Sequence, residues 1–315
     1  MEQGRGIASR LSGAKGPDVI SRLISAGARA FLVALLIALP SALLPGIADE
    51  SLQVVSLVAF VAAGLTFVEY FASYPSIIEF RDAPPFNRVR FIMIGLTVLI
   101  LTLALRDGYT PGPISGGFAA LASLCGQTLD FPYSPVRMVV LTLPEDAPRA
   151  TVAALRDGAG IAFAGGLVAL IFFFANVILR DWPYRLRTFN VWVNLPLFDP
   201  TSGGDVLKRL RRDSNVNISL GVLLPFLTPA MVRMASDAFD PLVLAEPHTL
   251  IWTMTAWAFL PVSLIMRGIA LGRVADMIAA KRRRAYAKSQ RQEAEQPTAT
   301  VKPGPKKDRL RPQAA

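Results

Sequence analysis

Six apolar runs separated by polar segments dominate the chain. A hydrocarbon core of about 30 Å is crossed by roughly 20 helical residues, and each run is near that length. The run AGIAFAGGLVALIFFFANVIL has no polar face, whereas a buried helix of a soluble protein normally keeps one. The pattern predicts an all-α, polytopic membrane bundle of about six transmembrane helices. The predicted spans are 30–47, 52–74, 89–105, 159–179, 216–231 and 249–266.

Basic residues gather on alternate connections between these runs. Most of the 33 Lys and Arg residues lie before the first run, between the second and third, between the fourth and fifth, and after the sixth. The short connections on the other side are acidic instead, with Asp49 and Glu50 in one and Asp237, Asp240 and Glu246 in the other. Because cytoplasmic loops carry an excess of Lys and Arg, both termini are predicted to be cytoplasmic.

The pattern also divides the chain into three parts. These are a basic cytoplasmic segment at 1–29, the six-span membrane domain at 30–280 and a basic cytoplasmic tail at 281–315. The tail is polar and contains Pro, so we expect a helical continuation of the sixth span to about Gln292, followed by disorder.

The first run has an alternative interpretation as a cleaved signal peptide. Gly46 and Ala48 precede Asp49 and offer a small-residue cleavage site. The basic leader before the run is longer than a usual signal-peptide n-region, which favours a retained span.

The outer connection at 106–158 is long enough to contain structure of its own. Its segment FAALASLCG is too short to span the bilayer, and a surface cap is favoured over a re-entrant piece. Pro148 suits a first helical turn, and a short helix is predicted at 150–155, ended by Gly158. The single cysteine, Cys125, cannot form an intramolecular disulfide, and we interpret it as a small apolar residue.

Two inner connections resemble each other. EFRDAPPFNRVRF follows the second run and LRDWPYRLRTFNVW follows the fourth, and both read Arg-Asp-x-Pro, an aromatic residue, then Arg-x-Arg. A parallel internal repeat and chance similarity both explain this. The Arg-Asp pair can bond locally, while Arg-x-Arg is available for lipid phosphates or an acidic partner. The candidate binding residues are Arg81, Asp82, Arg88 and Arg90 in one loop, and Arg180, Asp181, Arg185 and Arg187 in the other.

The longer inner loop, 180–215, ends in a basic segment. Residues 205–213 predict a short helix with Val206, Leu207 and Leu210 as its apolar points, suited to lie on an anionic leaflet. The lipid- or partner-binding candidates of this helix are Lys208, Arg209, Arg211 and Arg212.

Few polar side chains fall within the spans. Glu69 lies near the inner end of the second run, and Asn215 and Asn217 lie at the start of the fifth; together they are the candidate intramembrane polar site. No run has a carboxylate near its middle, which argues against a proton relay. Arg267 is at the inner edge of the sixth run, where a long basic side chain is expected to extend to the interface.

The sequence contains no motif with catalytic chemistry. It lacks a Walker loop, a dinucleotide glycine fingerprint, a zinc-protease motif and a nucleophile elbow. His248 is the single histidine and has no nearby Cys for a metal site. We therefore expect no enzyme activity, no cofactor and no metal.

By elimination, the sequence favours an accessory, scaffold or assembly factor of the cell inner membrane, acting through basic cytoplasmic loops and an ordered outer loop. The alternative is a small-solute transporter or channel, with a polar cavity along the fifth span that ends near Asn215 and Asn217. The expected partners are anionic lipid headgroups on the cytoplasmic side and a membrane-protein partner. Nucleic acid is not expected, because no aromatic stacking platform accompanies the basic tail.

Overall fold

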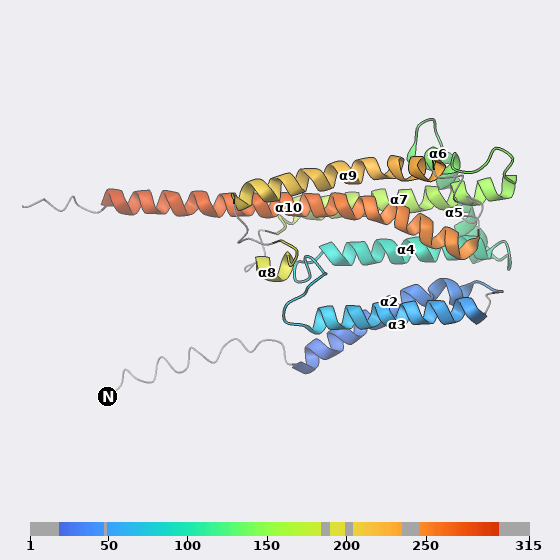
Figure 1. Ribbon diagram of the computed structural model, residues 1–315, viewed down its shortest axis with the longest axis horizontal. Coiled ribbons are helices and arrows are strands. Elements are labelled where there is room, and N and C mark those ends of the chain that lie inside the picture. Colours follow the sequence, from blue (N-terminus) through green and yellow to red (C-terminus); the bar gives the residue numbers. More distant parts are fainter. Residues whose placement is uncertain (1–18, 47–48, 184–189, 199–203, 235–245, 296–315) are drawn as a thin grey trace, which may run out of the picture.

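The computed structural model describes residues 19–46, 49–183, 190–198, 204–234 and 246–295, and these form helices and loops without strands. Long helices run side by side and in alternating directions (Figure 1). The helices are α2 (Val19–Leu43), α3 (Asp49–Phe71), α4 (Phe86–Arg106), α5 (Pro113–Leu129), α6 (Pro135–Val140), α7 (Arg149–Leu179), α8 (Val191–Asn194), α9 (Val206–Met234) and α10 (Pro247–Glu295).

Six of these helices, α2, α3, α4, α7, α9 and α10, are long and apolar enough to cross a bilayer. The predicted fold class is therefore confirmed, and the protein is a multi-pass membrane protein. The spans begin and end at other residues than the apolar runs do. For example, α2 begins at Val19, eleven positions before the first run, because the amphipathic segment ahead of the run also forms regular helix turns.

The α9–α10 pair is held together by small residues that bring the two backbones close. A Cβ atom on Gly221 would lie 2.6 Å from the carbonyl oxygen of Pro261, and one on Gly268 would lie 2.7 Å from that of Ser214. The Ser214 hydroxyl also donates to the Gly268 carbonyl oxygen at 2.7 Å. Since lipid tails are as apolar as the helices, such close packing and interhelical hydrogen bonding stabilise pairs of membrane helices.

Close packing also joins α5 to α7. A Cβ on Gly160 would lie 2.4 Å from the backbone nitrogen of Gly126, so only glycine fits at this crossing. The predicted helix at 150–155 is confirmed as the start of α7, but its predicted end at Gly158 is wrong, because α7 runs through that glycine without a break. A Cβ atom on Gly158 would lie 2.8 Å from the Leu250 Cδ2 of α10, so glycine leaves room for the Leu250 side chain. This packing offsets the low helix propensity of glycine.

The outer segment forms α5 and α6, which lie at the end of the bundle opposite the α10 extension (Figure 1). α5 packs against α4 and α7, and whether it is a surface cap or a re-entrant piece stays a prediction. Cys125, on α5, is a free thiol whose partial burial raises its pKa.

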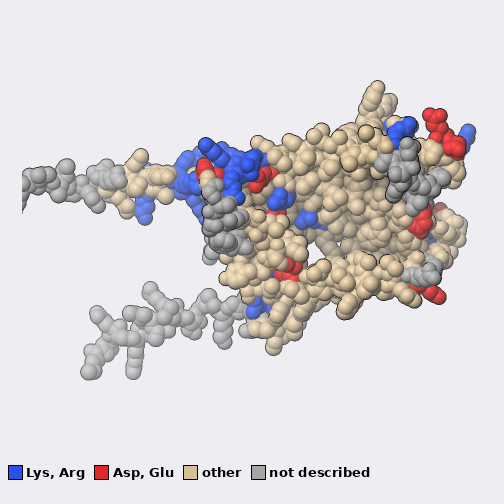
Figure 2. All heavy atoms as spheres, viewed as in Figure 1, with Lys and Arg blue, Asp and Glu red and all other residues tan. Residues whose placement is uncertain are grey.

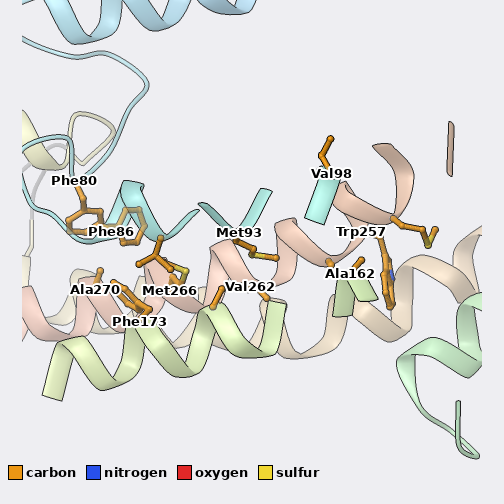
Figure 3. Close-up of a cluster of buried hydrophobic side chains, with 14 of the residues drawn as sticks. Phe80, Phe86, Met93, Val98, Ala162, Phe173, Trp257, Val262, Met266 and Ala270 are labelled. Carbon is orange, nitrogen blue, oxygen red and sulfur yellow. The ribbon is translucent and has the colours of Figure 1, made fainter. Parts of the chain in front are cut away.

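The main apolar core lies between α4, α7 and α10 (Figure 3). At the end from which α10 extends, which the charge pattern predicts to be the inner end and which is named so below, Phe86 of α4 meets Phe173 of α7 edge-on, with 5.7 Å between ring centroids. Farther along, Phe163 of α7 lies near Trp257 of α10. The α2–α3 hairpin is less embedded, since large apolar side chains of α3 such as Phe60 and Val68 are exposed. In a membrane protein this surface faces lipid.

The inner ends of α9 and α10 differ from expectation in one respect. The basic segment 205–213 is not a separate interfacial helix, because it continues without a break into the fifth span as the first turns of α9. Its apolar point Leu210 is buried in the main core cluster, which includes side chains of α10, so the segment is fixed by helix packing rather than by a leaflet. The predicted extension of the sixth span is confirmed, since α10 continues to Glu295. The predicted disorder after it falls on residues outside the described part of the chain.

Candidate functional site

An ion pair joins three elements at the inner end of the bundle. The guanidinium of Arg267 on α10 donates to both carboxylate oxygens of Glu79, at 2.5 and 2.9 Å, and to the side-chain oxygen of Asn217 on α9 at 3.1 Å. Glu79 belongs to the loop between α3 and α4, and its side chain is only 8% exposed. The guanidinium thus turns to a protein carboxylate instead of extending to the interface, and it ties the loop to two spans.

Glu69, on α3, binds the same loop through hydrogen bonds. Its buried carboxylate accepts hydrogen bonds from the backbone nitrogens of Ser76, Ile77 and Ile78, at 3.0 to 3.1 Å for one oxygen, and from the Ser76 hydroxyl. A carboxylate that satisfies three backbone N–H groups organises the turn that follows the helix. In this fold Glu69 is therefore a structural acid.

The three members of the candidate intramembrane polar site are not brought together by shared contacts. Glu69 bonds to the turn at 76–78, Asn217 bonds to Arg267 and to the Asp213 carbonyl, and Asn215 is exposed on α9. The polar cavity expected along the fifth span would need these three groups to line one space, and their contacts do not bring them together.

Arg81 is taken up by the fold rather than presented to a partner. Its guanidinium donates to the carbonyl oxygen of Glu69 in the last turn of α3, and to those of Ala72 and Ser73 directly after the helix. Such a basic group satisfies free carbonyls and interacts favourably with the helix dipole. Arg81 also pairs with Asp82 at 3.3 Å, and its side chain is 9% exposed.

The two similar inner loops lie next to each other. Phe80 of the first loop packs on Trp182 of the second, with ring centroids 5.8 Å apart, and its backbone nitrogen donates to the Asn194 carbonyl at 2.7 Å. Backbone with positive φ falls at Phe80 in one loop and at Asp181 in the other, which are different positions of the Arg-Asp-x-Pro pattern. An internal repeat stays a prediction.

The second loop offers fewer described side chains. Asp181 pairs with Arg273 of α10 at 3.2 Å, and Arg180 ends α7 as its C-cap residue. Arg185 and Arg187 lie outside the described residues.

Arg88 and Arg90, in the first turns of α4, have no carboxylate partner among the described residues. Arg88 is exposed and makes no hydrogen bond with the described part of the chain. The Arg90 guanidinium stacks over Phe86 and Phe259, 5.3 and 5.2 Å from the ring centroids. Its Nη1 donates to the Asn87 amide oxygen at 3.3 Å, whereas its Nε is buried without an acceptor.

These arginines border a cavity of about 860 Å³ between the α2–α3 hairpin and the rest of the bundle. Figure 2 shows a hollow between these two parts. Its lining comes from α2, α3, the loop after α3, α4, α10 and Leu197, and α9 contributes none of it. The charged lining residues are Arg29, Glu79, Arg81, Arg88, Arg90 and Arg267.

The basic residues of α9 lie at the same end of the bundle, where most of the visible Lys and Arg gather (Figure 2). Lys208 is exposed, and Arg209 stacks on Phe198 at 4.8 Å. Arg211 pairs with Asp276 of α10 at 3.5 Å, and Arg212 pairs with the adjacent Asp213. Farther along α10, a hydrogen bond from Arg282 holds the pKa of Asp205 below its usual range.

Sequence reasoning missed the Glu79–Arg267 pair and the contribution of Arg29. Glu79 and Arg267 are 188 positions apart, and each taken alone resembles an ordinary interfacial charge. The signal in the sequence was their opposite charge at the inner ends of two spans. Only the arrangement of α10 beside the loop after α3 makes them partners.

No protein-family model, curated protein or solved structure matches this chain.

Proposed function

We propose that this protein is a non-catalytic accessory or scaffold protein of the cell inner membrane, with both termini in the cytoplasm and its basic inner end presented to an acidic partner. The observation that carries the proposal is the extension of α10 beyond the bundle (Figure 1).

The extension is built to present charge away from the membrane. α10 passes the start of α9 at the Arg282–Asp205 ion pair, whose charged groups are 3.0 Å apart. At about 1.5 Å per residue, 283–295 continue for about 20 Å. The side chains of 281–292 are exposed. The basic side chains of this extension are Lys281, Arg282, Arg283, Arg284, Lys288 and Arg291.

Its direction favours a protein partner over the lipid surface. The extension continues in line with the bundle (Figure 1), so it points away from the leaflet rather than lying on it. Attraction to anionic lipid falls off within a Debye length of about 8 Å at physiological ionic strength. The outer turns of the extension are therefore beyond the field of the leaflet and available to an acidic cytoplasmic surface.

The charged groups near the spans support a non-catalytic role. Glu69 organises a turn, and Glu79, Arg267 and Asn217 bind one another across three elements. These contacts use the groups for assembly of the fold. The transporter alternative has no corresponding support, because the cavity has no wall from α9.

Site-specific photocrosslinking in native membranes tests the proposal. A photoreactive residue at Tyr286, exposed on the extension, should give one discrete protein adduct. The same residue at Phe60, on the lipid-facing side of α3, is the matched control and should give none. Replacing Lys288 and Arg291, the basic residues of the outer turns, by Ser should abolish the adduct, and the adduct partner should co-purify with the wild-type chain in constant ratio. Absence of an adduct at Tyr286, or an adduct that persists without these two charges, would overturn the proposal.

A further inference from the structure

The walls of the inner cavity change from basic to apolar between the inner and the outer end of the bundle. On α2, Arg29 is followed by Leu32 and Val33 toward the outer end, and on α4, Arg88 and Arg90 are followed by Ile92 and Ile94. α10 runs the opposite way and shows the opposite order, from Phe259 to Arg267. Three helices therefore place cations at the inner end and apolar side chains deeper in the bundle, which complements an amphiphile with an anionic head.

The charge of the cavity is unbalanced. Its described lining contains five arginines and one glutamate. Arg267 is paired with Glu79, and Arg81 is held by the end of α3 and by Asp82. The remaining cations, Arg29, Arg88 and Arg90, have no carboxylate partner among the described residues.

Two of these remaining arginines are held by aromatic side chains. The Arg29 guanidinium is 4.6 Å from the ring centroid of Tyr70, which also lines the cavity. Arg90 is held in place by Phe86 and Phe259 but has a buried Nε without an acceptor. A half-buried guanidinium without a carboxylate partner is unfavourable, and a phosphate bound in the cavity would balance its charge.

The cavity also communicates with the surface that faces lipid. Ile92 lines the cavity and is 56% exposed, and Leu32 lines it from α2 and is 45% exposed. A volume of about 860 Å³ lies within the range of about 300–1,000 Å³ typical of ligand pockets. This space suits a headgroup with the first part of its acyl chains, while the rest of the chains stays in the bilayer.

From this geometry we infer that the cavity between the α2–α3 hairpin, α4 and α10 is a specific site for one anionic phospholipid, whose phosphate is bound by Arg88, Arg90 and Arg29. The inference rests on the membrane placement proposed above, and it concerns a different surface from the α10 extension. A bound lipid would also join the hairpin to the rest of the bundle, where direct packing is sparse.

Native mass spectrometry of the purified, delipidated full chain tests the inference. The probes are phosphatidylglycerol, phosphatidylcholine with the same acyl chains, and glycerol phosphate, which has the headgroup chemistry without chains. We expect phosphatidylglycerol to bind in a one-to-one complex, at least tenfold more tightly than phosphatidylcholine. Glycerol phosphate should not displace it. Equal binding of the two lipids, or displacement by glycerol phosphate, would overturn the assignment.

Variants locate the site. Arg88→Gln and Arg90→Gln should each weaken phosphatidylglycerol binding about tenfold or more, because each removes a charge-assisted contact to phosphate. Arg88 is exposed and makes no hydrogen bond or ion pair with the described residues, so its variant remains informative if Arg90→Gln does not fold. Arg211→Gln and Arg212→Gln remove equal charge outside the cavity and should change affinity less than threefold. Equal losses in the cavity and control variants would indicate only general attraction to basic surface and would overturn the inference.

The outcome is independent of the partner proposal. Lipid binding is measured on the purified chain, so loss of the Tyr286 adduct leaves it unaffected. Conversely, a failure of lipid binding leaves the crosslinking result unaffected.

Discussion

The Glu79–Arg267 pair is predicted to be the main polar clamp between the α3–α4 loop and α10. Replacing Glu79 by Gln removes the charge while keeping the size of the side chain. It leaves Arg267 with neutral acceptors in place of the carboxylate, namely the amide oxygens of Asn217 and of the substituted side chain.

The expected loss follows from burial. Two unit charges about 4 Å apart attract by about 4 kcal/mol at an effective dielectric constant near 20. Removal of one partner from a fully buried pair costs about 3–5 kcal/mol. The Arg267 side chain is 31% exposed, so water screens part of its charge in the variant. We therefore expect Glu79→Gln to lower the free energy of unfolding by about 2 kcal/mol.

A control from the same loop separates this effect from general loss of charge. Asp82 pairs with Arg81, but its side chain is 60% exposed. An exposed pair contributes about 0–1 kcal/mol, so Asp82→Asn should change stability by about 0.5 kcal/mol or less.

Unfolding by sodium dodecyl sulfate in mixed micelles gives these free energies for the purified chain. In a double-mutant cycle, Glu79→Gln with Arg267→Met should lose less than the sum of the single variants, since no unpaired buried charge remains. The reasoning is refuted if Glu79→Gln is as stable as Asp82→Asn, or if the two single losses simply add.

Three further predictions concern packing and reactivity. Gly160→Ala should destabilise by about 1–3 kcal/mol, because its Cβ would overlap the backbone of α5, whereas Gly95→Ala, with open space around it, should be neutral or slightly stabilising in the same unfolding assay. Trp182→Ala should cost about 3–5 kcal/mol, since the ring is 4% exposed and packs on two phenylalanines, and the exposed Tyr133→Ala should change little. Because burial raises the pKa of Cys125, its thiolate fraction at pH 8 is below that of an exposed cysteine, so its maleimide labelling rate should continue to rise at pH values where an exposed thiol has levelled off.

The fold class and the six spans could be predicted from the sequence, because membrane-spanning helices obey a simple rule of length and apolarity. The two shortest runs, 89–105 and 216–231, lie within the longer helices α4 and α9. Helix ends were harder to predict, since Gly158 and the basic segment at 205–213 both resemble boundaries locally. α7 continues through Gly158, which packs on Leu250, and α9 includes the basic segment, whose Leu210 is buried in the core.

The candidate site was predictable only in part. Arg88 and Arg90 were selected because they are basic and near the inner interface, and the structure places both at the cavity. Arg81 was a candidate for the same reason and Asp82 was its local partner, yet Arg81 completes the end of α3. A sequence pattern cannot distinguish an arginine that binds backbone carbonyl oxygens of the protein from one that remains available to a ligand. The difference depends on which segments the fold brings next to the arginine.

The most direct test of the account is the orientation of the charged ends across the membrane. In a Cys125→Ser background, Ser289→Cys places a thiol on the exposed α10 extension, and Tyr109→Cys places one at the opposite end, where Tyr109 is 55% exposed. A membrane-impermeant maleimide is applied to sealed right-side-out and inside-out vesicles. We predict that Tyr109→Cys is labelled only in right-side-out vesicles and Ser289→Cys only in inside-out vesicles. The reverse pattern, or labelling of both thiols from the same side, would contradict a six-span protein whose basic end is cytoplasmic.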